Sequence, residues 1–198
     1  MPADPPRAWQ RMLSGRRLDL LDPSPLDVEI EDIALGLSRV ARWNGQTTGR
    51  HGFSVAQHSL LVVDLVAAGR PPASDRMLLA ALLHDAGEYV TSDLITPFKA
   101  AVGPAYKDVE RRLERAVYLR FGLPAELPAN WRRRIKRADK VAAFVEATAL
   151  AGFTVPEARR VLGFRGHAPA IDLVPQPPES VRADFLKRFR LLSGGAGR

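Results

Sequence analysis

The segment MLLAALLHDAGE, residues 77–88, constrains the fold more than any other part of the sequence. Its apolar run continues to Leu83 and is followed at once by His84, Asp85 and, one helical turn further on, Glu88. A run of this kind predicts a buried helix. Ionisable groups at the end of a buried helix are costly unless they are paired or bind a metal ion. The chain must therefore fold so that other polar groups meet this helix end.

Length and composition are typical of one globular domain. The chain has 198 residues, of which 46% are hydrophobic and 26% are charged, enough for a substantial core. It contains no cysteine, which excludes disulfides, thiolate metal sites and thiol nucleophiles. Neither a signal peptide nor an uninterrupted apolar segment of about 18 residues is evident. We therefore expect a cytoplasmic protein without a membrane span.

Apolar residues recur at helical spacing along most of the chain, and no pair of strands stands out. Residues 6–15 form a short amphipathic segment that Gly15 ends, and Ser54 and Ser74 are predicted helix N-caps. Helices are expected over residues 30–40, 54–69, 74–87, 104–121, 128–152, 156–162 and 179–192. Because no repeat or linker divides this series, the sequence predicts a single all-α domain over residues 1–198.

Two further polar residues stand where helical periodicity predicts inward-facing ones. His58 follows the Ser54 cap by four positions on an otherwise apolar face, and Asp139 interrupts an apolar ridge of the longest helix. Taken singly, each is more typical of a buried group satisfied by hydrogen bonds than of a metal ligand. Together with His84 and Asp85, they place H, HD and D on three helices.

This order resembles the HD-domain metal-dependent phosphohydrolases. The segments SVAQHS, HDAGEYVTSDLITPFK and IKRADKVAAF are similar to blocks of the small bacterial 5′-deoxynucleotidases and of related phage deoxyadenosine triphosphatases. The similarity covers about residues 30–145 and leaves 153–198 as a C-terminal helical extension. It implies an all-α helical bundle of the HD type that hydrolyses phosphate esters or anhydrides of nucleotides, with deoxyribonucleoside mono- or triphosphates as the expected substrates.

The resemblance also implies roles for individual residues. His58, His84, Asp85 and Asp139 would hold one divalent cation, and this nitrogen and oxygen donor set suits Mn, Co, Fe, Ni, Zn or Mg. Glu88 and the acid after it in the same block, Asp93, would serve in proton transfer and water positioning, and a second ion is left open. The alternatives are a solvated helix-end acid for Glu88 and a cap or turn residue for Asp93.

Three more residues are candidates for substrate binding. The segment SRVARWNGQT resembles the Arg-Trp segment of the same family, which places Arg42 near the phosphate and Trp43 near the deoxyribose. Lys99 could add a further positive charge. The alternatives are a surface arginine and a core tryptophan. The chain departs from its relatives in carrying Gln46 where they often have histidine, and no role is evident for His51 or His167.

Two other classes of function remain open at this point. A binding protein could keep the metal pocket to sense a nucleotide without turnover, although such a sensor needs no proton-transfer acids. The net charge of +7 and the segment WRRRIKR, residues 131–137, raise a nucleic-acid phosphodiesterase or binder. A solvated helix face explains that segment more simply, so a nucleic acid is not the expected partner. A homodimer is also left open, because the last helix is amphipathic.

Overall fold

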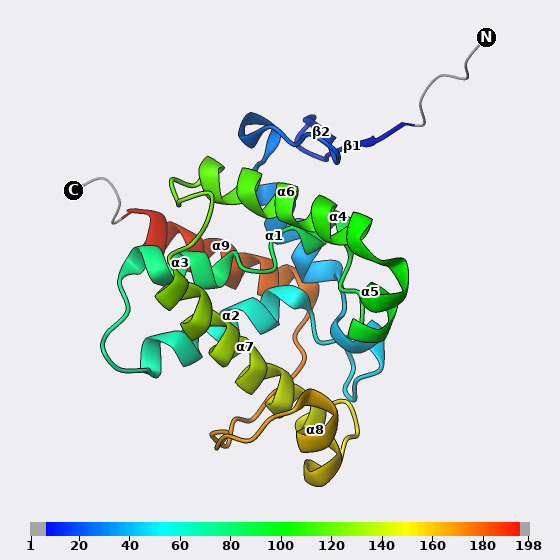
Figure 1. The fold of residues 1–198 in the computed structure, drawn as a ribbon, viewed down its shortest axis with the longest axis vertical. Helices are drawn as coiled ribbons and strands as arrows, with labels where there is room; N and C mark the ends of the chain where they lie inside the picture. Colours follow the sequence, from blue (N-terminus) through cyan, green and yellow to red (C-terminus); the bar gives the residue numbers. More distant parts are fainter. Residues whose placement is uncertain (1–6, 195–198) are drawn as a thin grey trace.

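The computed structural model describes residues 7–194, and nearly all of their regular structure is helical (Figure 1). The α-helices are α1 (Ile30–Arg39), α2 (Val55–Ala68), α3 (Asp75–Leu82), α4 (Glu88–Thr91), α5 (Thr96–Val102), α6 (Pro104–Arg120), α7 (Ala129–Ala149), α8 (Val155–Leu162) and α9 (Pro178–Ser193). Two short 3-10 helices, η1 (Pro25–Asp27) and η2 (Arg42–Gly45), flank α1. The predicted all-α fold class is confirmed.

Helix α2 lies at the centre of the bundle. It packs against α1, α3, α7 and α9, so that side chains from all parts of the chain meet around it. Helix α6 runs across one side of the molecule, and α8 lies at the opposite end (Figure 1). The main core includes fully buried residues from α1, α2, α3 and α9, and a smaller cluster around Phe144 and Phe164 joins α7 to α8. No helix within the described residues is long and apolar enough to cross a membrane.

The predicted helix starts are confirmed where serines cap them. Ser54 accepts a hydrogen bond from the Gln57 backbone at the start of α2, and Ser74 does the same for Met77 in α3. Each cap satisfies a backbone N–H that has no partner inside its own helix. These caps fix where α2 and α3 begin, and hence the register of the site residues that they carry.

The N-terminal segment corrects the expectation that strand pairs are absent. Strands β1 (Trp9–Arg11) and β2 (Arg17–Asp19) form an antiparallel hairpin. Gly15 takes a positive φ of 93° in the turn between them, a backbone conformation that residues other than glycine rarely adopt. The Arg17 guanidinium also stacks 4.4 Å from the Trp9 ring centroid. These cross-strand contacts favour the hairpin over the amphipathic segment that the sequence predicts.

The apolar helix of residues 77–88 also ends earlier than expected. Helix α3 stops at Leu82, and residues 83–87 form tight turns before α4 begins at Glu88. Backbone hydrogen bonds from Ala86 to Leu83 and from Glu88 to Asp85 hold these turns. The break places His84 and Asp85 in a turn at the end of the buried helix. From this turn, His84 Nε2 and Asp85 Oδ2 come within 3.2 Å of each other.

Candidate metal and nucleotide site

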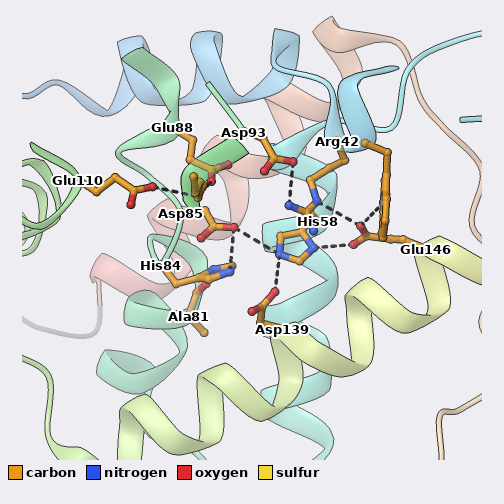
Figure 2. Close-up of polar contacts among 12 residues, drawn as sticks. Arg42, His58, Ala81, His84, Asp85, Glu88, Asp93, Glu110, Asp139 and Glu146 are labelled. Atoms are coloured by element: carbon orange, nitrogen blue, oxygen red, sulfur yellow. Dashed lines mark hydrogen bonds and ion pairs between the residues drawn. The ribbon is translucent and has the colours of Figure 1, made fainter. Parts of the chain in front are cut away.

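The structure brings together the four residues predicted as metal ligands (Figure 2). His58 comes from α2, His84 and Asp85 from the turn after α3, and Asp139 from α7. His58 Nε2 lies 3.3 Å from Asp139 Oδ1 and 3.5 Å from Asp85 Oδ2. His84 Nε2 lies 3.2 Å from the same Asp85 oxygen. Ligand atoms of His58, His84 and Asp139 all lie within 4.8 Å of one another, so these three residues could hold a metal ion.

Hydrogen bonds set the orientation of both imidazoles. His84 Nδ1 donates to the Ala81 carbonyl at 2.8 Å, and His58 Nδ1 donates to Glu146 Oε1 at 2.5 Å. A carbonyl and a carboxylate oxygen can only accept, so each Nδ1 carries the proton. Both Nε2 atoms are buried and have no hydrogen-bond partner in the described part of the chain. Two buried nitrogens aimed at two carboxylates form a donor set that fits a divalent cation.

Opposite charges hold this cluster together. Burial disfavours a charge on His58, but the Glu146 and Asp139 carboxylates outweigh it and raise the pKa of the imidazole to about 10. Burial opposes ionisation of Asp85 as well, yet the His84 and His58 imidazoles hold its pKa well below the usual value. The His58 charge thus offsets part of the charge of the carboxylates, and a divalent cation would take over that role while displacing the proton on Nε2.

Glu88 lies at the start of α4, in the same cavity as His84 and Asp85. The cavity has a volume of about 360 Å³. Burial raises the pKa of Glu88 to about 9, and the negative charges of Asp85 and Asp93 add to the effect. Its Oε2 atom is buried without a hydrogen-bond partner among the described residues. Glu88 is therefore a buried acid that faces the cluster and not a solvated helix end.

Asp93 lies in the loop between α4 and α5, where it pairs with Arg42. The Arg42 Nη1 donates to Asp93 Oδ2 at 2.9 Å. No side-chain cap is present at the start of α5, so Asp93 does not act as the helix cap that its turn-rich segment also allowed. The pair joins the loop before α5 to η2 next to the cluster of His58, His84, Asp85 and Asp139.

Arg42 and Trp43 lie in η2, directly after α1. Arg42 is largely buried, and its Nε donates to Glu146 Oε2 at 3.2 Å. The Trp43 indole N–H donates to the same oxygen at 3.0 Å, and the ring packs 5.6 Å from the Phe153 ring centroid. Trp43 has a positive φ of 56°, which is strained for a bulky residue and persists only where its surroundings enforce it. Arg42 is thus not a surface arginine, and Trp43 is held in a specific orientation beside the cluster.

Lys99, on α5, is engaged by two acids. Its Nζ lies 2.9 Å from Glu110 and 3.4 Å from Glu88. Despite partial burial, these carboxylates keep the lysine charged and raise its pKa. The structure therefore places Lys99 in the cavity, with Glu110 of α6 as a partner that the sequence reasoning did not identify.

Glu146 is the site residue that the sequence reasoning missed. It is fully buried on α7, and it contacts a predicted metal ligand as well as both residues of the Arg-Trp segment. Burial opposes its ionisation, but His58 and Arg42 lower its pKa to about 2. Glu146 follows Asp139 by seven residues, which is two helical turns and therefore the same face of the helix. The spacing of seven residues from Asp139 was the sequence feature that could have identified Glu146 as a site residue.

The basic segment of residues 131–137 lies on α7, just before Asp139. Within the segment Ile135 is buried, while most of the arginines are exposed, as expected for a solvated helix face. Arg134 is the exception, because it donates to the Val66 and Gly69 carbonyls at the end of α2. The segment lines an open groove of about 790 Å³ together with His167.

Comparisons with known proteins identify the family of this chain. Residues 35–151 match the family described as 5′-deoxynucleotidase YfbR-like. Over 192 residues, the chain is 57% identical to the uncharacterized protein RCAP_rcc00048 of Rhodobacter capsulatus, a match that covers 94% of this chain and 96% of that protein. The matched family segment begins in α1, ends just after α7, and includes every residue of the cluster. The chain belongs to the YfbR-like 5′-deoxynucleotidase family.

Proposed function

We propose that this protein is a divalent-metal-dependent phosphohydrolase that removes the phosphate from deoxyribonucleoside 5′-monophosphates. Membership of the family indicates a hydrolase. The observation that carries the proposal is the pair of buried, unpartnered Nε2 atoms of His58 and His84 beside two carboxylates. A monophosphate is preferred over the triphosphate because the matching family is described as a 5′-deoxynucleotidase.

In this proposal His58, His84, Asp85 and Asp139 hold the cation. When bound, the cation supplies Lewis-acid polarisation of the phosphate and lowers the pKa of a water molecule toward neutrality. The nature of the metal is left among Mn, Co, Fe, Ni, Zn and Mg, because nitrogen and oxygen donors accept all of them. The number of bound ions is likewise open.

Glu88 is the proposed general acid. A carboxyl group with a raised pKa keeps its proton at neutral pH, and Glu88 can then pass that proton from Oε2 to the departing 5′ oxygen of the nucleoside. The Lys99 ammonium, 3.4 Å from the other oxygen of Glu88, holds the side chain in place. Asp93 is proposed to orient the attacking water, with its own position fixed by Arg42.

Arg42 and Trp43 are the proposed substrate contacts. Arg42 uses Nε and Nη1 for Glu146 and Asp93, which leaves Nη2 without a protein partner among the described residues and able to donate to a phosphate oxygen. Trp43 would close the sugar side of the pocket and disfavour a ribose. Lys99 adds positive charge beside the phosphate that is attacked.

The test is phosphate release from a panel of ribo- and deoxyribonucleoside mono-, di- and triphosphates, after chelation and with Mn²⁺, Co²⁺, Mg²⁺ or Zn²⁺ restored. We expect metal-dependent release of inorganic phosphate, fastest from deoxyribonucleoside monophosphates. Asp85→Asn should abolish it, whereas Glu126→Gln, an exposed acid, should leave it unchanged. Folded, metal-loaded protein without turnover on the whole panel would contradict the proposal and favour a sensor.

A further inference from the structure

Glu146 connects the two halves of the site through a single side chain. Three donors converge on its two carboxylate oxygens (Figure 2). His58 Nδ1 bonds Oε1 at 2.5 Å, while Arg42 Nε and Trp43 Nε1 bond Oε2 at 3.2 Å and 3.0 Å. None of the glutamate is exposed to solvent. No water can therefore take the place of a lost partner without a rearrangement of the site.

Only an ionised carboxylate satisfies this arrangement. Both of its oxygens accept hydrogen bonds and neither donates. A glutamine at this position would turn its NH₂ group either toward the His58 N–H or toward the Arg42 and Trp43 donors. In both orientations two donors would face each other in a buried place, which leaves buried groups unsatisfied. The chemistry of the three partners thus requires glutamate and not merely a polar side chain.

The hydrogen bonds of Glu146 form two arms, one to His58 and one to Arg42 and Trp43, and each arm positions a group that the proposed reaction needs. On one side, the bond to His58 Nδ1 holds a proton there and directs Nε2 toward Asp139 and Asp85, where a bound cation would take its lone pair. On the other side, the bonds to Arg42 and Trp43 hold η2 in its strained backbone conformation. Because the arms end on the same carboxylate, neither side can move without disturbing the other.

We propose that Glu146 is a positioning residue that sets the His58 imidazole for the metal and, at the same time, Arg42 and Trp43 for the nucleotide. Metal affinity and nucleotide recognition then depend on one side chain that touches neither ligand. This inference rests on the proposed function for its nucleotide arm, whereas its metal arm stands on the contacts of His58 alone.

The experiment compares Glu146→Gln with the wild type and with Asp32→Asn. Asp32 is the matched control, because it is also a buried acid and its carboxylate accepts hydrogen bonds from Ser14 outside the site. Mn²⁺ affinity is measured by titration in the absence of nucleotide, and KM is then measured at Mn²⁺ concentrations that saturate each variant. We expect E146Q to bind Mn²⁺ about 10- to 100-fold more weakly and to raise KM about tenfold. D32N should change neither.

The outcomes separate this inference from the proposed function. A folded E146Q variant with unchanged Mn²⁺ affinity, or with unchanged KM at saturating metal, overturns the inference. A wild-type protein that binds Mn²⁺ but hydrolyses no nucleotide overturns the proposed function instead, and the metal arm can still be measured.

A measurement on the wild type covers the case in which E146Q fails to fold. In ¹⁵N-edited NMR of the Zn²⁺-loaded protein, we expect His58 to keep a slowly exchanging Nδ1 proton, with Nε2 bound to the metal. A spectrum in which the Zn²⁺ is bound through Nδ1, or in which Nδ1 has no protected proton, would overturn the role of Glu146.

Discussion

At the scale of single residues, Glu88 combines a function with a cost to stability. Its pKa rises from 4.5 to about 9 on folding, because of burial first and then the charges of Asp85 and Asp93. Because the pKa of Glu88 is higher in the folded than in the unfolded state, its contribution to the free energy of unfolding is largest below about pH 4.5. That contribution is lost as the pH rises toward about 9. The ionised carboxylate therefore destabilises the folded protein at alkaline pH.

Glu88→Gln should consequently abolish turnover and stabilise the metal-free protein. At pH 8 we expect the free energy of unfolding to rise by about 1–3 kcal/mol, because Glu88 must take up a proton on folding at this pH, whereas the neutral amide need not. Denaturant unfolding between pH 5 and pH 9 measures this, and the variant should show a smaller loss of stability with pH. Glu110→Gln removes the other Lys99 partner and serves as the control. A variant less stable than wild type at pH 8 would refute this assignment.

His58 makes metal binding dependent on pH. Because the Glu146 and Asp139 carboxylates overcome burial and raise its pKa to about 10, the ring must lose a proton before Nε2 can bind a cation. The apparent Mn²⁺ affinity should therefore rise about tenfold per pH unit between pH 7 and pH 9 for each proton displaced. Calorimetry in buffers with different ionisation enthalpies measures the proton release directly. An affinity that is constant over this range would contradict the account.

At the scale of elements, the close packing of α1 on α4 positions Glu88. Gly36 of α1 lies so near to α4 that an added Cβ would come within 2.7 Å of the Tyr89 Cβ and 3.0 Å of its carbonyl oxygen. Real contacts of this kind do not occur, so a larger side chain must push the two helices apart. Tyr89 follows Glu88 directly, and the displacement would reach the proposed acid.

Gly36→Ala should therefore reduce both stability and activity. Alanine favours a helix by about 1 kcal/mol over glycine, but overpacking costs about 1–3 kcal/mol, so we expect a small net loss of stability with a clear fall in kcat. Thermal unfolding and phosphate release measure the two effects. Gly87→Ala is the comparison for stability, because its added Cβ would meet only Leu113 at an ordinary 3.5 Å. A G36A variant as active as wild type would show that α4 tolerates the shift.

The sequence predicted elements well where local chemistry decides them. Ser54 and Ser74 begin α2 and α3 because a serine oxygen satisfies backbone N–H groups within the same turn. Features that depend on contacts between elements escaped prediction. The β1–β2 hairpin relies on pairing across Gly15, α5 (Thr96–Val102) follows a turn-rich segment and packs against α6, and α3 ends before the turn of residues 83–87.

At the scale of the whole molecule, the fold and the meeting of His58, His84, Asp85 and Asp139 could be foreseen. The resemblance to a known family supplied the second of these, because nothing in helical periodicity alone says that α2 and α7 lie side by side. Glu146 was missed for a physical reason. A glutamate among apolar residues on a helix is usually a solvated residue, and only the tertiary contacts show that Arg42 and Trp43 reach it.

The proposed function depends on His58, His84, Asp85 and Asp139 holding one divalent cation. The most direct measurement is the amount of Mn²⁺ bound per chain after equilibrium dialysis, for the wild type and for Asp139→Asn, with circular dichroism to show that both are folded. We expect about one ion per wild-type chain, as for a single cluster of this kind, and far less in the variant. A wild-type protein without bound metal, or a variant that binds as much as the wild type, would contradict it.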